Sequence, residues 1–75
     1  LRFGPAFFQS VPSSPGVYFL YDGLDGLLYI GQSANLRDRL GSYRHVNEMQ
    51  HPRRTLRLVS RIRRIVWQEC QTARE

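Results

Sequence analysis

Arg39, Tyr18 and Tyr29 are the side chains whose types and spacing point most directly to chemistry. The tyrosines belong to two tripeptides, Gly16-Val17-Tyr18 and Tyr29-Ile30-Gly31, and each tripeptide lies on an apolar, β-forming run. A guanidinium beside two phenols can hold a phosphate group through paired, charged hydrogen bonds. An arginine at the edge of an apolar helix face can instead pack its stem and keep its charge in water. Helix geometry alone leaves these alternatives even.

The two tyrosines are expected to meet through a β-hairpin. Residues 17–21 and 27–30 are apolar and β-forming, and the polar, glycine-containing segment between them is typical of a turn. If Gly23-Leu24 forms the tip, Tyr18 lies opposite Tyr29 and both phenols emerge on the same face of the sheet. A bulge at the end of the turn would slip this register.

A helix is predicted to carry Arg39. Asn35 is a typical N-cap residue, and apolar side chains follow at the spacing of one helix face, at Leu36, Leu40 and Tyr43. The helix is expected over about residues 36–44. Arg39 then falls within the apolar face rather than opposite to it.

The rest of the chain divides into a leading arm and a C-terminal helix and strand. Residues 1–14 are interpreted as an irregular arm that precedes a single domain of residues 15–75. Three aromatic side chains of the arm are expected to cover the core: Phe3, Phe7 and Phe8. A short basic helix is expected to begin at Pro52, followed by a strand at Ile65-Val66-Trp67. The boundary between them is predicted near residues 61–64.

Arginine dominates the charge of the chain. The 75 residues contain eleven Lys or Arg, none of which is lysine, and the formal net charge is +5. Arginine binds phosphate at two points, so this composition favours a polyanionic partner, and a solvated basic surface is the simpler alternative. The same two alternatives, a phosphate track or a solvated helix face, apply to the dense run Arg53, Arg54, Arg57, Arg61, Arg63 and Arg64.

Other chemistries have weaker support. The single cysteine, Cys70, excludes an internal disulfide and a cysteine-rich zinc site, and it is expected to be an inert, packed thiol. His45 and His51, with Glu48 between them, are spaced more widely than typical zinc ligands. No apolar run approaches the ~20 residues that cross a bilayer. We therefore expect a soluble, cytoplasmic protein without a membrane partner.

Three blocks, in this order and spacing, carry a family resemblance. They are Pro15-Gly16-Val17-Tyr18, then Leu28-Tyr29-Ile30-Gly31-Gln32-Ser33, then Asn35-Leu36-Arg37-Asp38-Arg39-Leu40 with Ser42-Tyr43. From residue 15 to residue 75 the chain resembles the GIY-YIG nuclease superfamily, and within it the N-terminal endonuclease domain of the excision-repair subunit UvrC. Val17 replaces the isoleucine of the family's name and removes no functional group.

The resemblance implies an α+β fold in which helices flank a small three-stranded antiparallel sheet. It also implies a DNA endonuclease that hydrolyses a phosphodiester bond with one divalent metal ion, Mg²⁺ or Mn²⁺, in a UvrC-like role in DNA repair. Catalytic roles pass to Tyr18, Tyr29, Arg39 and Tyr43. Arg39 would neutralise charge on the phosphoryl oxygens, and one phenol would orient or deprotonate the attacking water. A free tyrosine has a pKa of about 10, so the base needs a nearby cation, and either Tyr18 or Tyr29 can take this role.

Further candidate residues surround the three blocks. The candidate DNA contacts are Gln32, Asn35, Arg37, Arg44, Arg53, Arg57 and Arg61. Gly16 and Gly31 are candidate structural positions of the motif. The expected partners are DNA and other domains or repair subunits of a larger protein.

No metal ligand is expected within the chain. The resemblance places the metal-binding glutamate shortly beyond Glu75, in a helix that follows the third strand. Thr72-Ala73-Arg74-Glu75 has the pattern of a capping box, so we expect this helix to be truncated and the 75-residue piece to be inactive by itself. The alternatives are a non-catalytic DNA-binding module of the same fold and a stand-alone structure-specific or homing-type nuclease.

Overall fold

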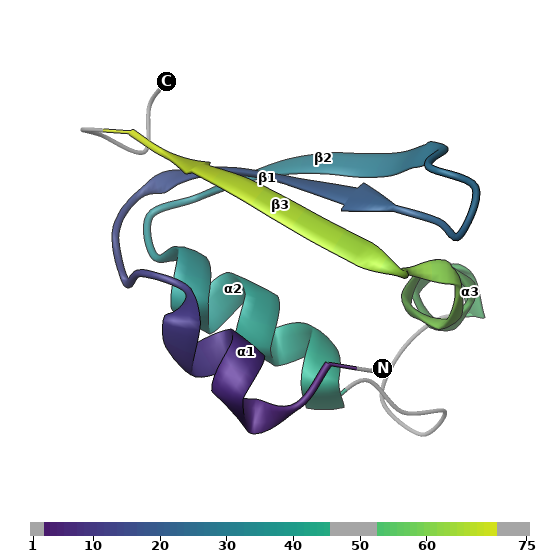
Figure 1. The fold of residues 1–75 in the computed structure, drawn as a ribbon, viewed down its shortest axis with the longest axis horizontal. Helices are drawn as coiled ribbons and strands as arrows, with labels where there is room; N and C mark the ends of the chain where they lie inside the picture. Colours follow the sequence, from purple (N-terminus) through teal and green to yellow (C-terminus); the bar gives the residue numbers. More distant parts are fainter. Residues whose placement is uncertain (1–2, 46–52, 71–75) are drawn as a thin grey trace.

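The computed structural model describes residues 3–45 and 53–70 (Figure 1). Along the chain the elements are α1 (Pro5–Ser10), β1 (Gly16–Tyr21), β2 (Leu27–Ser33), α2 (Leu36–Ser42), the 3₁₀ turn η1 (Tyr43–His45), α3 (Arg53–Arg61) and β3 (Arg64–Glu69). β1 is the central strand of an antiparallel sheet with the order β2-β1-β3. The predicted α+β fold with a three-stranded antiparallel sheet is therefore confirmed.

The core lies between the sheet and two helices. α1 and α2 lie side by side on one face of the sheet, and α3 lies beyond the end of the sheet that carries the hairpin turn (Figure 1). Alternate residues of β1 are buried, among them Tyr18 and Leu20, as expected for a strand with one face on a core. Leu36 and Leu40 of α2 are fully buried in the same cluster.

The opposite face of the sheet is less covered. Phe19 lies between Ile30 of β2 and Val66 of β3, and both of these partners are exposed. No helix of the described ranges lies over this face in Figure 1. The tyrosines of the two motif tripeptides lie on the helix-covered face instead.

The hairpin register differs from the predicted one. Tyr18 lies opposite Gly31 and Tyr29 lies opposite Leu20, so the predicted pairing of Tyr18 with Tyr29 is wrong. The two phenol rings nevertheless lie on one face of the sheet, with their centroids 6.0 Å apart. The predicted shared face is therefore confirmed.

Two insertions of one residue each cause this difference. The turn has three residues at its tip rather than two, because the Asp22 N–H donates to the Gly26 carbonyl. Asp25 adopts a left-handed φ of 61°, which aspartate tolerates in turns. Leu28 is then an extra residue in a β-bulge of β2. Because side chains alternate along a strand with a period of two, the two displacements together restore the original face.

The expected irregular arm contains a helix, α1. Pro5 stands in its first turn, where the fixed φ of proline favours a helix start and its missing N–H costs nothing. Phe8 and Val11 are buried in the core, and Phe7 packs edge-on against Trp67 of β3. The interpretation of these aromatic residues as core cover is confirmed. A helix of 6 residues is too short to show a periodic pattern, and tertiary packing stabilises it.

The later helices and the third strand are confirmed, with small shifts at their ends. The side chain of Asn35 accepts a hydrogen bond of 3.1 Å from the Asp38 N–H and caps α2 as predicted. α2 ends at Ser42, and the 3₁₀ turn begins at the next residue, Tyr43. α3 is described from Arg53 onward, and the predicted start at Pro52 lies outside the described residues. β3 contains the predicted strand segment and extends it at both ends.

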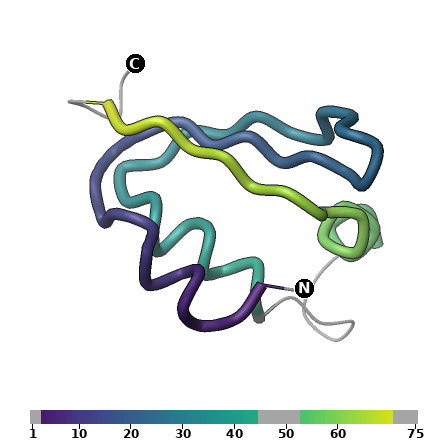
Figure 2. The backbone as a smooth tube through the Cα atoms, viewed as in Figure 1, coloured from purple at the N-terminus to yellow at the C-terminus, as the bar shows by residue number. Residues whose placement is uncertain are grey.

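α3 passes into β3 beside the hairpin turn (Figure 2). The Arg63 N–H donates to the Tyr21 carbonyl at 2.8 Å, and Ile62 is fully buried at this junction.

Within the described residues, no helix combines the length and apolar character that a membrane span needs. The capping-box residues 72–75 lie outside the described residues.

Candidate active site

Three tyrosines form a cluster on the helix-covered face of the sheet. Tyr18 of β1 is 2% exposed, and its hydroxyl shares a hydrogen bond of 3.1 Å with the hydroxyl of Tyr43. The Tyr18 ring centroid lies 6.0 Å from that of Tyr29 and 6.3 Å from that of Tyr43. The side chains come from β1, β2 and the turn after α2, so three separate elements position them.

Gly31 creates the space that the Tyr18 ring occupies. A Cβ atom at Gly31 would lie 2.2 Å from Cζ and 2.3 Å from the hydroxyl oxygen of Tyr18. Gly16 is equally confined, because a Cβ atom there would lie 2.4 Å from the Gln68 carbonyl oxygen of β3. Both candidate motif glycines therefore permit close approach of other atoms, which any larger side chain would prevent.

The environment of Tyr18 opposes its ionisation. Burial is the largest cause that raises its pKa far above the ordinary value of 10.0, and the hydrogen bond to Tyr43 adds to it. The positive charge of Arg39 acts in the other direction and lowers this pKa. Tyr18 is therefore held as a neutral phenol at neutral pH, and the charge of Arg39 reaches it.

Arg39 lies on α2 at the edge of the apolar helix face. Leu36 and Leu40 on either side of it in the helix are fully buried, whereas Arg39 itself is exposed. Arg39 lines a cavity of about 430 Å³ together with two of the predicted DNA contacts, Gln32 and Asn35. The structure therefore places the guanidinium of Arg39 in one cavity with the amide side chains of Gln32 and Asn35, and the charge of Arg39 also acts on Tyr18.

A second cavity opens beside the tyrosines toward α3. It has a volume of about 350 Å³ and is lined by Tyr29, Tyr43, Arg54, Thr55 and Leu58. Arg54 was predicted only as a member of the basic run, and Thr55 and Leu58 were not predicted as site residues. Arg54, Leu58 and the buried Ile62 follow one another at a spacing of four, which is the signal that places Arg54 on the inward side of α3.

The remaining predicted DNA contacts lie in two other places. Arg37 and Arg44 line a cavity of about 400 Å³ beside α1. Arg37 donates to the carbonyls of Val11 at 2.7 Å and Gln9 at 3.2 Å, and Arg44 lies over the ring of Phe8. Both side chains thus contribute to the attachment of α1.

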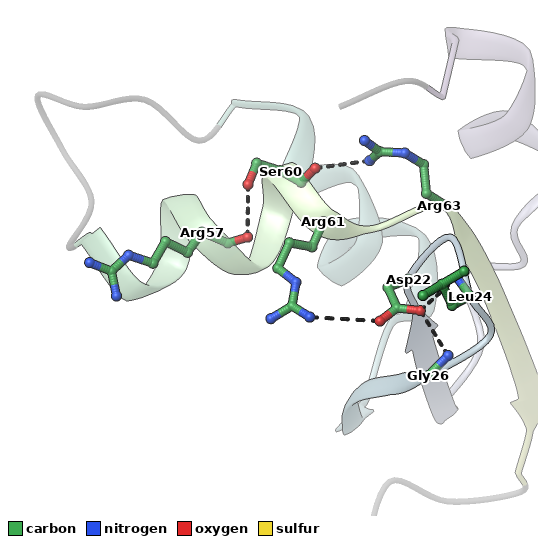
Figure 3. A network of polar contacts seen from close by, with 7 residues as sticks. All are labelled: Asp22, Leu24, Gly26, Arg57, Ser60, Arg61 and Arg63. Atoms are coloured by element: carbon green, nitrogen blue, oxygen red, sulfur yellow. Dashed lines mark hydrogen bonds and ion pairs between the residues drawn. The ribbon is translucent and has the colours of Figure 1, made fainter.

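The other three predicted DNA contacts lie on α3, on residues that do not line the cavity beside the tyrosines. Arg53, Arg57 and Arg61 are exposed and spaced by four, so they share one stripe of α3. Figure 3 shows that Arg61 reaches the hairpin turn, where it forms an ion pair of 3.7 Å with Asp22. The same carboxylate accepts hydrogen bonds from the N–H groups of Leu24 and Gly26 (Figure 3).

The described residues do not form a metal centre. Within residues 3–45 and 53–70, no group of three or more His, Cys, Asp and Glu side chains gathers in a way that could hold a metal ion. The weaker alternative of His51 and Glu48 lies outside the described residues, as does the side chain of His45. Cys70 is partly buried, and its Sγ lies 3.9 Å from the Gln68 carbonyl oxygen.

The order of the strands, the helices on one face and the tyrosines from both arms of the hairpin define a small α+β domain of the GIY-YIG type. A model of the UvrC-like GIY-YIG domain matches residues 14–75. The chain belongs to the family of UvrC-like GIY-YIG domains.

Similar proteins and structures agree with this assignment. The chain is 42% identical over 57 residues to the UvrABC system protein C of Acidothermus cellulolyticus, and 57% identical over 35 residues to that of Chlamydia pneumoniae. These stretches cover 76% and 47% of the chain but only 9% and 6% of the two relatives. The crystal structure of the N-terminal endonuclease domain of UvrC from Thermotoga maritima, bound to magnesium as its catalytic divalent cation, superposes with a TM-score of 0.74 at 22% identity. That match covers 92% of this chain and 72% of that structure.

Proposed function

We propose that this domain hydrolyses one phosphodiester bond of DNA, as the endonuclease domain of a UvrC-like repair protein. The observation that carries the proposal is the tyrosine cluster. The ring centroids of the buried Tyr18 and the exposed Tyr29 lie 6.0 Å apart, and the charge of Arg39 acts on Tyr18. Family membership supports the same reaction. The net charge of +5, supplied by arginine, favours DNA as the partner.

The phenols have different tasks in this proposal. Tyr29 is 44% exposed and can meet a water molecule, so we assign it the orientation or activation of the attacking water. Tyr18 is buried, keeps its proton and holds Tyr43 in place through their hydrogen bond. Arg39 neutralises the charge that develops on the phosphoryl oxygens. Gln32 and Asn35, which line the same cavity as Arg39, contact the DNA backbone.

We propose that the reaction also needs a divalent cation, Mg²⁺ or Mn²⁺. The Thermotoga maritima domain binds magnesium as its catalytic cation, which supports this requirement. Residues 3–45 and 53–70 provide no ligand set, and we propose, as the resemblance to the family implies, that a carboxylate of the helix after the third strand binds the cation. When bound, the cation would act as a Lewis acid on a phosphoryl oxygen. We accordingly expect the 75-residue piece to bind DNA and to cut it negligibly.

The decisive experiment separates cleavage from binding in the full-length protein that contains this domain. Arg39→Ala is expected to lose about 10²-fold or more in the rate of DNA cleavage, because one charge-stabilising donor is removed, with a much smaller change in DNA affinity. Tyr29→Phe keeps the ring, deletes only the hydroxyl and is expected to behave in the same way. Leu24→Ser, at an exposed position of the hairpin tip, is the control and should cut normally.

A non-catalytic DNA-binding module is the alternative function. It would bind DNA in the full-length protein with Mg²⁺ or Mn²⁺ present and cut none of the substrates offered. A stand-alone structure-specific or homing-type nuclease would instead cut without the other repair subunits. The cytoplasmic location and the partnership with repair subunits stay predictions that the same preparations can test.

A further inference from the structure

We propose that the cavity between the tyrosines and α3 is a nucleotide subsite, in which Arg54 binds a phosphate and the apolar wall receives the base of the DNA residue next to the cleaved bond. This inference rests on the proposed nuclease function, because it assigns part of the same substrate to residues outside the motif blocks. It gives α3 a specific role in addition to its general positive charge.

The position of Arg54 within α3 is the first support. Leu58, one helical turn later, packs against the core, and Ile62, a further turn on, is fully buried. Arg54 therefore begins the stripe of α3 that faces the body of the domain. It is exposed at the point where this stripe meets Tyr29 and Tyr43 in the cavity.

The composition of the cavity is the second support. Its two tyrosine rings and Leu58 give the flat and apolar surface on which a base can stack, whereas Arg54 and Thr55 offer a guanidinium and a hydroxyl for a phosphate. Its volume of about 350 Å³ lies within the roughly 300–1,000 Å³ that is typical of small-ligand pockets. Both ion pairs between described residues, Arg61 with Asp22 and Arg64 with Asp25, leave Arg54 uninvolved.

The arrangement of the two cavities is the third support. Arg39 lines one cavity and its charge acts on Tyr18, whereas Arg54 lines the other cavity together with Tyr29 and Tyr43. A DNA strand that places its scissile phosphate at Arg39 therefore extends either toward α3 or away from it. The second cavity fits the first of these directions, with one nucleotide per cavity.

A binding experiment without metal tests the subsite separately from catalysis. Thymidine 3′,5′-bisphosphate is titrated in EDTA into the isotope-labelled full chain, and NMR signals of the cavity residues are followed. A tetrahydrofuran 3′,5′-bisphosphate of the same charge but without a base is titrated in parallel. We expect the signals of Tyr43, Thr55 and Leu58 to shift most, and the nucleotide to bind at least fivefold more tightly than its abasic analogue, about the lower limit for one stacked base.

Charge-matched variants identify the role of Arg54. Arg54→Gln should weaken nucleotide binding roughly tenfold, because a charge-assisted contact is lost. Arg64→Gln removes the same charge from β3, where Arg64 stacks on Tyr21, and should change the affinity less than about twofold. Thr55→Val keeps the branched shape, preserves the fold and should weaken binding severalfold.

Three results would overturn the subsite: equal losses in Arg54→Gln and Arg64→Gln, equal affinity for the nucleotide and the abasic analogue, or signal shifts centred on another cavity. Cleavage by the full-length protein is measured independently. If the full-length protein cleaves DNA and any of these three binding results is also found, only the subsite is rejected. Nucleotide binding at this cavity without cleavage in the full-length protein would support the subsite and reject the nuclease function.

Discussion

The ring of Tyr18 lies directly against the Cα of Gly31, on the neighbouring strand. Tyr18 and Gly31 are register partners, and a Cβ atom at Gly31 would lie 2.2 Å from Cζ of the tyrosine. Gly31, the glycine of the second motif tripeptide, therefore leaves the space in which the Tyr18 ring packs against β2. From there the Tyr18 hydroxyl reaches Tyr43.

Gly31→Ala is therefore expected to displace Tyr18. The added methyl group overpacks the ring, and overpacking of this kind costs about 1–3 kcal/mol in the free energy of unfolding. The hydrogen bond to Tyr43 should be lost at the same time, and cleavage by the full-length protein should fall with it. Urea unfolding of the chain and cleavage assays of the full-length protein measure the two effects.

Gly41→Ala is the matched control for this prediction. Nothing lies within 4 Å of a Cβ atom at Gly41, which is a residue of α2, so alanine should stabilise the helix by roughly 0.5–1 kcal/mol. If Gly31→Ala were as stable as the unsubstituted chain, the close approach of Tyr18 would be contradicted.

The pH dependence of stability should report the burial of Tyr18. Its pKa in the folded chain is raised above the ordinary value of 10.0, so between that value and the folded pKa the unfolded chain loses this proton and the folded chain keeps it. The stabilisation is complete below pH 10 and decreases as the pH rises further. Tyr18→Phe cannot ionise and lacks this decrease.

The difference in the free energy of unfolding between the unsubstituted chain and Tyr18→Phe isolates the effect of Tyr18 ionisation. At pH 8, Tyr18→Phe should be less stable by about 1 kcal/mol, because the hydrogen bond to Tyr43 is lost. From pH 10 to pH 11 this deficit should shrink, because only the unsubstituted chain is destabilised through Tyr18. Urea unfolding across this range measures the deficit, and a deficit that stays constant or grows would contradict the buried, neutral phenol.

Sequence patterns predicted the elements of this domain better than their junctions. The N-cap at Asn35 and the apolar spacing of α2 are local signals, and they were confirmed. The three-residue turn and the bulge at Leu28 were missed, because both depend on how β2 pairs with β1. The prediction that Tyr18 and Tyr29 share a face was still correct, because two shifts of one residue each add up to the two-residue period of a strand.

The candidate site was predictable where a residue type stood out from its pattern. Arg39 was noticeable as a charge within an apolar helix face, and it lies where its charge reaches Tyr18. Arg54 is likewise a charge in line with the apolar residues of its helix, but it was not distinguished in the sequence because other arginines surround it. The attachment of α1 by Arg37 had no sequence signal, since it joins residues that are 26 and 28 positions apart.

Arg37 is expected to act mainly on stability. Its guanidinium donates to two carbonyls at the end of α1, so Arg37→Ala should lower the free energy of unfolding by about 1–3 kcal/mol. Arg37→Lys keeps the charge but loses the planar two-point contact, and it should lose most of this stability as well. Both variants are compared by urea unfolding. Full stability of Arg37→Lys would show that charge, rather than the paired contact, is what matters.

The salt dependence of DNA binding tests the basic stripe of α3. Each phosphate contact that is removed reduces the slope of log K against log salt by roughly one, because fewer counterions are released. Replacing Arg57 and Arg61 together by alanine should flatten the slope by roughly one to two units. Binding is measured by fluorescence anisotropy between low and physiological salt. An unchanged slope would leave this stripe as a solvated helix face.

The contribution of Arg61 to DNA binding is expected to depend on its ion pair with Asp22. The pair is long, at 3.7 Å, and the arginine side chain is 64% exposed, so it contributes little stability and competes with DNA for the guanidinium. Asp22→Asn keeps the Oδ1 acceptor that both turn N–H groups use, and it removes the competing charge. It should therefore tighten DNA binding and steepen the salt slope. In an Arg61→Ala background the same substitution should have a clearly smaller effect, because the released guanidinium is absent. Equal effects of Asp22→Asn in both backgrounds would mean that Arg61 does not contact DNA and that only the net charge has changed.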